Sequence, residues 1–374
     1  MSPADGAARA IDPGAGIVSG ARSLHAAADD AAPEPNGIAV TPGPLNLLTD
    51  VAGIRVGHAD DSRLASGATA IVFEQPTVVS IDIGGGGPGT RESDLLDPAR
   101  TVDRIDAITL SGGSAFGLDA ASGVQAYLRS IGRGYAVGTA RIPLVPAAIL
   151  FDLLNSGDKD WGRYPPYREL GFAAAETATT RFALGSVGAG FGATTVNFKG
   201  GIGSASAVIE GGFTVAALAA VNAAGTVVVG DGPWFWAAPF EQNGEFGGRG
   251  FPAQVPPAAL LPRTKGAPRA NTTLVVVATD AALTKAQARH LAVMAQDGLA
   301  RAIHPVHTPL DGDVVFAAAT GVRPLANPVF DLMAIGSATA QAVSRAIARG
   351  VFEATALPFP QAVPSYRTRF PSPP

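Results

Sequence analysis

Short apolar runs alternate with glycine-containing turns along most of the chain, and this pattern predicts β-strands. Their near-continuous Val, Ile and Ala content is typical of strands that are covered on both faces of a sheet. A four-residue connection before the run at 226–229 fits a hairpin turn. The expected strands are 68–73, 78–83, 106–110, 205–210, 213–221, 226–229, 273–279 and 314–319.

Apolar positions at helical spacing occur in three longer segments, 115–131, 284–303 and 330–348. Thr284 is a suitable N-cap for the second of these helices. The mixture of strands and helices predicts an α/β protein in which helices cover layered sheets. No internal repeat indicates a solenoid.

Three stretches lack this patterning. Residues 1–45 carry few large apolar side chains, bury too little surface to offset the entropy of ordering, and are expected to be a disordered leader. The proline-rich tail from about residue 358 is expected to be irregular, and 239–269 reads as an exposed loop because turn formers dominate it. Residues 46–374 are expected to form a single domain.

Composition narrows the functional classes. The 374 residues are 47% apolar and 16% charged, which is sufficient for a sizeable core, and the chain has no cysteine for disulfides, thiolate metal sites or a thiol nucleophile. The net charge of −4 gives no electrostatic reason to expect nucleic acid or an anionic membrane as a partner. No run reaches the ~20 apolar residues of a membrane span. Without a signal-peptide pattern, a cytoplasmic location is expected.

Thr272 lies where the expected loop meets a buried strand, in the run Asn271-Thr272-Thr273. A nucleophile that becomes a new N-terminus needs this setting, because the loop lets the preceding peptide distort and the strand then holds the new terminus. A freed α-amino group has a pKa of about 7.7–8.0 and can act as a general base near neutral pH. One residue then supplies both nucleophile and base. The simpler interpretation is that two β-branched residues begin a strand.

Further motifs occur in a fixed order on both sides of this junction. They are LTDVAGIRVGHADD, GGGGPGTRESDLL, DAITLSGGSAFGLDAASGV, RIPLVPAAILFDL, FKGGIGSAS and the segment that begins NTTLVVVATD. With them the chain resembles, from about residue 48 to 349, the self-processing N-terminal-nucleophile aminopeptidases. This family includes L-aminopeptidase/D-Ala-esterase/amidases, β-peptidyl aminopeptidases and nylon-oligomer endo-hydrolases.

The resemblance implies an αββα four-layer sandwich like that of N-terminal-nucleophile hydrolases, with its own connectivity. It also implies self-cleavage between Asn271 and Thr272 into chains 1–271 and 272–374 that stay bound together. A homotetramer of such processed heterodimers is expected from the resemblance. No cofactor or metal is expected.

The resemblance assigns roles around Thr272. Asp311 and Asp313 occupy the position of a pair that orients the nucleophile and its ammonium group. Asn222 is the expected oxyanion donor, worth roughly 3–4 kcal/mol in the transition state. Lys199, in a glycine-rich stretch, is expected to set the charge near the Thr272 hydroxyl.

The substrate pocket is expected to be walled by Gly112, Gly113, Ser114 and Phe151. Phe151 stands where some relatives have a tyrosine, so a hydroxyl contact to the substrate is absent or supplied elsewhere. Relatives cleave α-peptides, β-peptides, D-amino-acid amides or 6-aminohexanoate oligomers, and the Asn-Thr junction leans weakly toward the last. Endo- and exo-cleavage stay undecided.

Four other interpretations are open. Residues 84–89, GGGGPG, match G-x-G-x-x-G but continue into a proline-bracketed polar stretch, so a tight backbone loop is favoured over a dinucleotide site. Ser114 follows a strand and opens a helix, as the nucleophile of a serine hydrolase does. His304 and His307, with the nearby aspartates, could suggest a metal site. An unprocessed, non-catalytic paralogue is the last alternative.

Overall fold

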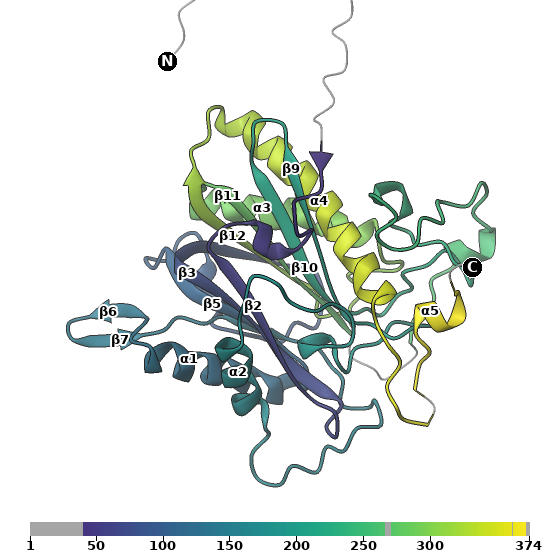
Figure 1. The fold of residues 1–374 in the computed structure, drawn as a ribbon, viewed down its shortest axis with the longest axis horizontal. Coiled ribbons are helices and arrows are strands. Elements are labelled where there is room, and N and C mark those ends of the chain that lie inside the picture. The colour runs from purple at the N-terminus through teal and green to yellow at the C-terminus, as the bar shows by residue number, and fades with distance from the viewer. Residues whose placement is uncertain (1–39, 266–270, 361, 372–374) are drawn as a thin grey trace, which may run out of the picture. The chain divides into compact units, whose positions relative to one another are not determined.

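The computed structural model describes residues 40–265, 271–360 and 362–371, all within one unit of the fold, Ile38–Pro374 (Figure 1). The expected leader therefore lies outside the described residues, apart from 40–45. Residues Val40–Thr41 of that stretch form a short strand, β1, paired with β9. No helix in the described ranges has the length and apolar character to cross a membrane.

The fold is built on one ten-stranded sheet. Its strand order is β1-β9-β10-β11-β12-β3-β5-β8-β4, and β2 pairs with β3 beside this path. Its further strands are β2 (Ile54–Asp61), β3 (Ser66–Ile83), β4 (Thr90–Arg91), β5 (Arg104–Ser111), β8 (Ala147–Ile149), β9 (Ile202–Ile209), β10 (Thr214–Asn222), β11 (Thr272–Ala281) and β12 (Val314–Arg323). A separate hairpin is formed by β6 (Tyr135–Val137) and β7 (Ala140–Ile142). The α-helices are α1 (Ala120–Ser130), α2 (Tyr167–Glu176), α3 (Lys285–Ala300), α4 (Pro328–Phe352) and α5 (Tyr366–Arg369).

The long strand β3 divides this sheet into two stacked halves. Its first part pairs with β2 and β5, and its second part pairs with β12. The ladder with β5 has a register shift between Val72 and Thr77. Between the halves lies a core to which both contribute, for example Phe73 and Ile108 from one half and Val276 from the other. Residues alternate across each strand, so the opposite face of each half must be covered by another layer.

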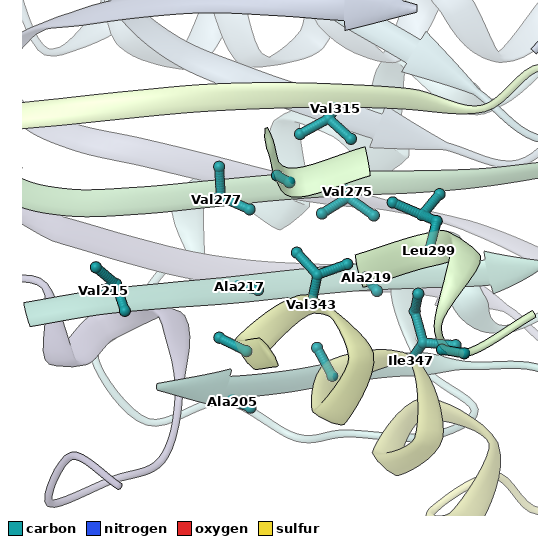
Figure 2. Packing of buried hydrophobic residues seen from close by; sticks show 14 of the residues in the cluster. Ala205, Val215, Ala217, Ala219, Val275, Val277, Leu299, Val315, Val343 and Ile347 are labelled. Atoms are coloured by element: carbon teal, nitrogen blue, oxygen red, sulfur yellow. The ribbon is translucent and has the colours of Figure 1, made fainter. Parts of the chain in front are cut away.

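Helices supply both outer layers. Val275 on β11 and Val343 on α4 belong to the core between β9–β12 and helices α3 and α4, part of which is shown in Figure 2. Val72 on β3 and Val124 on α1 belong to the core between the other half and helices α1 and α2. The order is helix, sheet, sheet, helix (Figure 1), and the predicted αββα four-layer class is confirmed.

The element predictions were mostly confirmed, with informative errors. The expected strands 68–73 and 78–83 are one strand, because β3 passes Glu74-Gln75-Pro76 without a break. The expected strand 226–229 is wrong: it makes only isolated bridges, and its hairpin is replaced by a full ladder of β10 with β11. Strand β2 and helix α2 were not predicted.

The helix predictions also needed adjustment at their ends. The expected helix 115–131 begins with a 3-10 segment, Ser114–Asp119, in which Gly117 approaches the Gly112 carbonyl so closely that a Cβ would not fit. Helix α3 begins as predicted, with Thr284 accepting from the Gln287 backbone in a capping box. Helix α4 extends past both ends of the expected 330–348.

The stretches expected to be irregular are partly structured. The predicted loop 239–269 includes two short 3-10 segments, and Phe246 within it is buried, while its residues 266–269 lie outside the described part. The predicted irregular tail is wrong at Tyr366, which begins α5, is fully buried and donates from its hydroxyl to the Pro233 carbonyl.

Candidate active site around Thr272

Thr272 is the first residue of β11, the strand that lies between β10 and β12 in the sheet. It is almost fully buried, and its Cα is paired with that of Asn222, the last residue of β10. The predicted nucleophile and the predicted oxyanion donor therefore come together at the ends of two neighbouring antiparallel strands. Ten consecutive buried residues hold β11 in the core and fix the position of Thr272.

The peptide bond between Asn271 and Thr272 is held on several sides. The Thr272 hydroxyl donates to the Asn271 carbonyl, and the Gly312 N–H donates to the same oxygen at 2.7 Å. The Asn271 N–H donates to the Leu310 carbonyl. A Cβ at Gly312 would lie 2.7 Å from Thr272 Oγ1, so only glycine leaves room for this arrangement. The hydroxyl thus lies against a carbonyl that is already polarised by a backbone donor.

The two aspartates of the D-G-D turn are both buried beside this bond. Asp313 accepts from the Thr273 N–H at 2.7 Å, which places one carboxylate oxygen next to the head of β11. Asp311 accepts from the Thr308 N–H and hydroxyl and from the Ala224 N–H. Burial, followed by the charge of Asp313, raises the pKa of Asp311.

Asn222 has its side chain fixed by hydrogen bonds at both ends of the amide. Its Oδ1 accepts from the Thr194 N–H at 3.0 Å, and its Nδ2 donates to the Phe151 carbonyl at 3.0 Å. The Lys265 ammonium donates to Asn222 Oδ1 and to its backbone carbonyl. The amide nitrogen therefore faces the segment that contains Phe151.

Lys199 is a buried ammonium that donates to the carbonyls of Gly190 and Gly200 at 2.9 and 2.7 Å. Burial lowers its pKa to about 7, against the opposing charge of Asp152. A group with a pKa in this range can give up or take a proton near neutral pH, which is what proton transfer in a hydrolase requires.

Several of these residues line one cavity of about 230 Å³. It presents both polar and apolar groups, as small-molecule sites do. Its lining is Phe151, Asp152, Leu154, Asn155, Ser156, Gly192, Thr194, Lys199, Lys265, Asn271, Leu357, Ala362 and Val363.

Asp152 is a cavity residue that the sequence did not predict. It is buried and accepts from the Ser66 hydroxyl at 2.6 Å and from the Gly113 N–H at 2.7 Å. Burial raises the pKa of its carboxyl group. The available signal was an acid placed directly after the apolar run that ends in Phe151.

The predicted pocket residues take different places. Phe151 lines the cavity, whereas Gly112, Gly113 and Ser114 are not among its lining residues. Gly112 and Gly113 instead lie against the Asp152 carboxylate. Ser114 has a left-handed backbone, φ 52°, as a strained serine nucleophile can have. Among the described residues, however, no histidine or acid is hydrogen-bonded to its hydroxyl.

The two histidines considered for a metal site have separate hydrogen-bond partners. His304 Nε2 lies 3.1 Å from the Leu260 carbonyl, and His307 Nδ1 lies 2.9 Å from Asp313 Oδ2. Within the described ranges, the structure has no group of three or more His, Cys, Asp or Glu residues that could hold a metal ion.

Two stacked sheets between outer layers of helices are the architecture of the N-terminal-nucleophile hydrolase fold. The fold is similar to that of the L-aminopeptidase D-Ala-esterase/amidase from Ochrobactrum anthropi, itself described as a variant of this fold. The TM-score is 0.64 at 20% identity, over 87% of this chain and 92% of that one. The chain belongs to peptidase family S58, whose sequence model matches residues 46–363.

Two relatives place the chain within this family of peptide- and amide-bond hydrolases. A Mycobacterium tuberculosis protein named as an uncharacterized aminopeptidase is 44% identical over 348 residues, 87% of this chain and 98% of that protein. A 6-aminohexanoate-oligomer endohydrolase of Kocuria sp. is 28% identical over 286 residues, 74% of this chain and 76% of the enzyme. The predicted family is confirmed.

Proposed function

We propose that the protein cleaves itself between Asn271 and Thr272 and then hydrolyses amide bonds with Thr272 as an N-terminal nucleophile. The observation that carries this proposal is the contact between the Thr272 hydroxyl and the Asn271 carbonyl, with the Gly312 N–H on the same carbonyl oxygen. Nucleophile, target carbonyl and a donor for the developing negative charge are already assembled in the uncleaved chain.

In the first stage, Thr272 Oγ1 attacks the Asn271 carbonyl carbon and its proton passes to the Thr272 nitrogen. The carbon–nitrogen bond breaks, which leaves an ester between Asn271 and the Thr272 side chain. Water hydrolyses this ester and releases the Asn271 carboxylate and the Thr272 amine. The Gly312 N–H, 2.7 Å from the Asn271 oxygen, stabilises the oxyanion that forms there.

In the second stage, the freed Thr272 amine accepts the hydroxyl proton as Thr272 Oγ1 attacks a substrate carbonyl. Asn222 is the proposed donor to the substrate oxyanion, because it is the strand partner of Thr272. Asp313 lies beside the head of β11 and holds the new ammonium group in place, while Asp311 and Lys199 set the local charge. The acyl-enzyme ester is then released by water.

The proposed substrates are short peptides or peptide-like amides that fit the cavity at Asn271. Relatives named as aminopeptidases and as 6-aminohexanoate-oligomer endohydrolases support this range. Assembly into a homotetramer of processed heterodimers and a cytoplasmic location stay predictions from the sequence.

The test is the mass of the purified protein. We expect wild type to give two fragments that correspond to 1–271 and 272–374, Thr272→Ala to stay at 37.6 kDa, and Thr272→Ser to be processed. Thr273→Val is the matched control, since it changes the neighbouring buried threonine without touching the nucleophile. Processing of Thr272→Ala would contradict the proposal. An intact wild type would favour the Ser114 hydrolase or the non-catalytic paralogue.

A further inference from the structure

The glycine run after β3 contacts the D-G-D turn through its backbone. The N–H groups of Gly84 and Gly85 donate to the Asp313 carbonyl at 3.0 and 3.3 Å, and the Gly87 N–H donates to the Asp311 carbonyl at 2.7 Å. A Cβ at Gly85 would lie 2.3 Å from the Asp311 carbonyl oxygen, so the two backbones can approach only because side chains are absent. This motif therefore holds the turn that carries the acid pair, and it explains why a glycine run follows β3.

His307 completes this support on the side chain of Asp313. Its Nδ1 lies 2.9 Å from Asp313 Oδ2, and its backbone N–H donates to the same oxygen at 3.2 Å. A Cβ at Gly84 would lie 2.9 Å from the imidazole ring, so the ring is packed directly on the glycine run. The other carboxylate oxygen, Oδ1, accepts from the Thr273 N–H. One oxygen of Asp313 is thus held by His307 and the other lies at the head of β11.

We propose that His307 is a positioning residue, which fixes the carboxylate of Asp313 against the Thr272 end of β11 through two hydrogen bonds to one oxygen. This inference rests on the proposed function, because it concerns the same proton relay. Replacement of the His307 side chain removes the Nδ1 partner of Asp313 Oδ2 and leaves the backbone N–H, so the carboxylate is held less firmly against Thr273.

The charges around His307 make this support dependent on pH. Asp313 and Asp311 face the ring from the turn, and Asp82 faces it from β3, where Arg289 of α3 pairs with Asp82 at 2.7 Å. Burial alone would lower the pKa of His307, but the hydrogen bond and charge of Asp313, together with the other two aspartates, raise it. As pH rises through this raised pKa, the imidazolium is lost and Asp313 loses a cationic partner, although neutral Nδ1–H still donates.

The experiment follows conversion of freshly translated full-length chain into two fragments between pH 5.5 and 9. His307→Ala removes the side-chain bond, and we expect processing to slow by roughly tenfold to a hundredfold, the value of one hydrogen bond to a charged group. His307→Asn keeps a donor, tolerates the left-handed backbone found here, φ 54°, and cannot titrate. We expect it to process at near the wild-type rate at pH 7.5 and to lose one ionisation from the pH profile.

His290→Ala, which removes an exposed histidine on α3, is the matched control and should behave as wild type. Equal rates for His307→Ala and His290→Ala would overturn the inference, as would an unchanged pH profile for His307→Asn. If His307→Ala fails to fold, the pH profile of processing by His307→Asn tests the inference on its own. Wild type and Thr272→Ala are measured in parallel. An unprocessed wild type would contradict the proposed function itself. Processing that requires Thr272 but keeps its rate when His307 is replaced would contradict only this inference.

Discussion

At the scale of single residues, the site depends on two buried groups of opposite charge beside one cavity. Burial favours the neutral form of Lys199 and of Asp152, while each charge favours the ionised form of the other. The opposing charge of Asp152 keeps the pKa of Lys199 from falling further than about 7. Asp152 therefore influences the fraction of Lys199 that is protonated near neutral pH. The sequence alone does not show that these two residues interact.

Removing the charge of Asp152 should shift the ionisation of Lys199. In Asp152→Asn the pKa of Lys199 falls, because only burial remains, so the Lys199 ionisation in the pH profile of processing moves to lower pH. The profile is measured as for His307. Asp158→Asn, which removes an exposed carboxylate paired with Arg63, serves as the control and should leave the profile unchanged. A profile of Asp152→Asn that coincides with wild type would show that Lys199 does not set that ionisation.

At the scale of elements, local pattern predicted the buried strands but not the contacts between them. Strand β11 could be recognised from the sequence because its buried positions include a continuous apolar run. Strand β2 includes exposed charged positions and lacks such a run, so the sequence did not predict it. The position of Thr272 where a loop meets a buried strand could be found from the local pattern, and its proposed role as the cleavage site came from the family resemblance. The bond between Ser66 and Asp152 joins residues 86 positions apart, and no local pattern encodes such a contact. The same holds for the packing of His307 on the glycine run.

An ion pair connects the loop before the proposed cleavage site to helix α4 after it. Arg345 of α4 is 1% exposed and donates to both carboxylate oxygens of Glu245 at 2.5 and 3.0 Å. It also donates to the Ser206 carbonyl of β9. Breaking a buried pair by removing one partner leaves an uncompensated charge, which costs about 3–5 kcal/mol.

Glu245→Ala should therefore lower the free energy of unfolding by about 3–5 kcal/mol, because Arg345 stays buried without its carboxylate. The measurement is urea unfolding of the Thr272→Ala background, in which the proposed cleavage does not complicate the transition. Glu210→Ala removes an exposed carboxylate at the end of β9 and should change stability little. A loss of less than about 1 kcal/mol in Glu245→Ala, the range of exposed pairs, would mean that the pair is solvated in solution.

At the scale of the whole molecule, the segment that follows Thr272 is interleaved with the segment that precedes it. Strand β11 pairs with β10, and β12 pairs with β3, so two central strands after the junction lie between strands that come before it. Helix α4 packs against β9 and β10, and its residues Val343 and Ile347 lie in the same core as Val215 and Ala217 (Figure 2). The proposed cleavage after Asn271 would break one peptide bond and none of these ladders.

The two processed chains should consequently stay together and unfold as one unit. Separation would expose the buried faces of β11, of residues 314–319 of β12 and of one side of α4. We expect fragments 1–271 and 272–374 to co-elute in size-exclusion chromatography and to separate only in denaturant, with a single transition seen by two spectroscopic probes. Native mass spectrometry of the same peak would give the number of copies and so test the expected homotetramer. A small fragment that elutes alone under native conditions would contradict the interleaved arrangement, since two strand ladders and a shared core would then have failed to hold it.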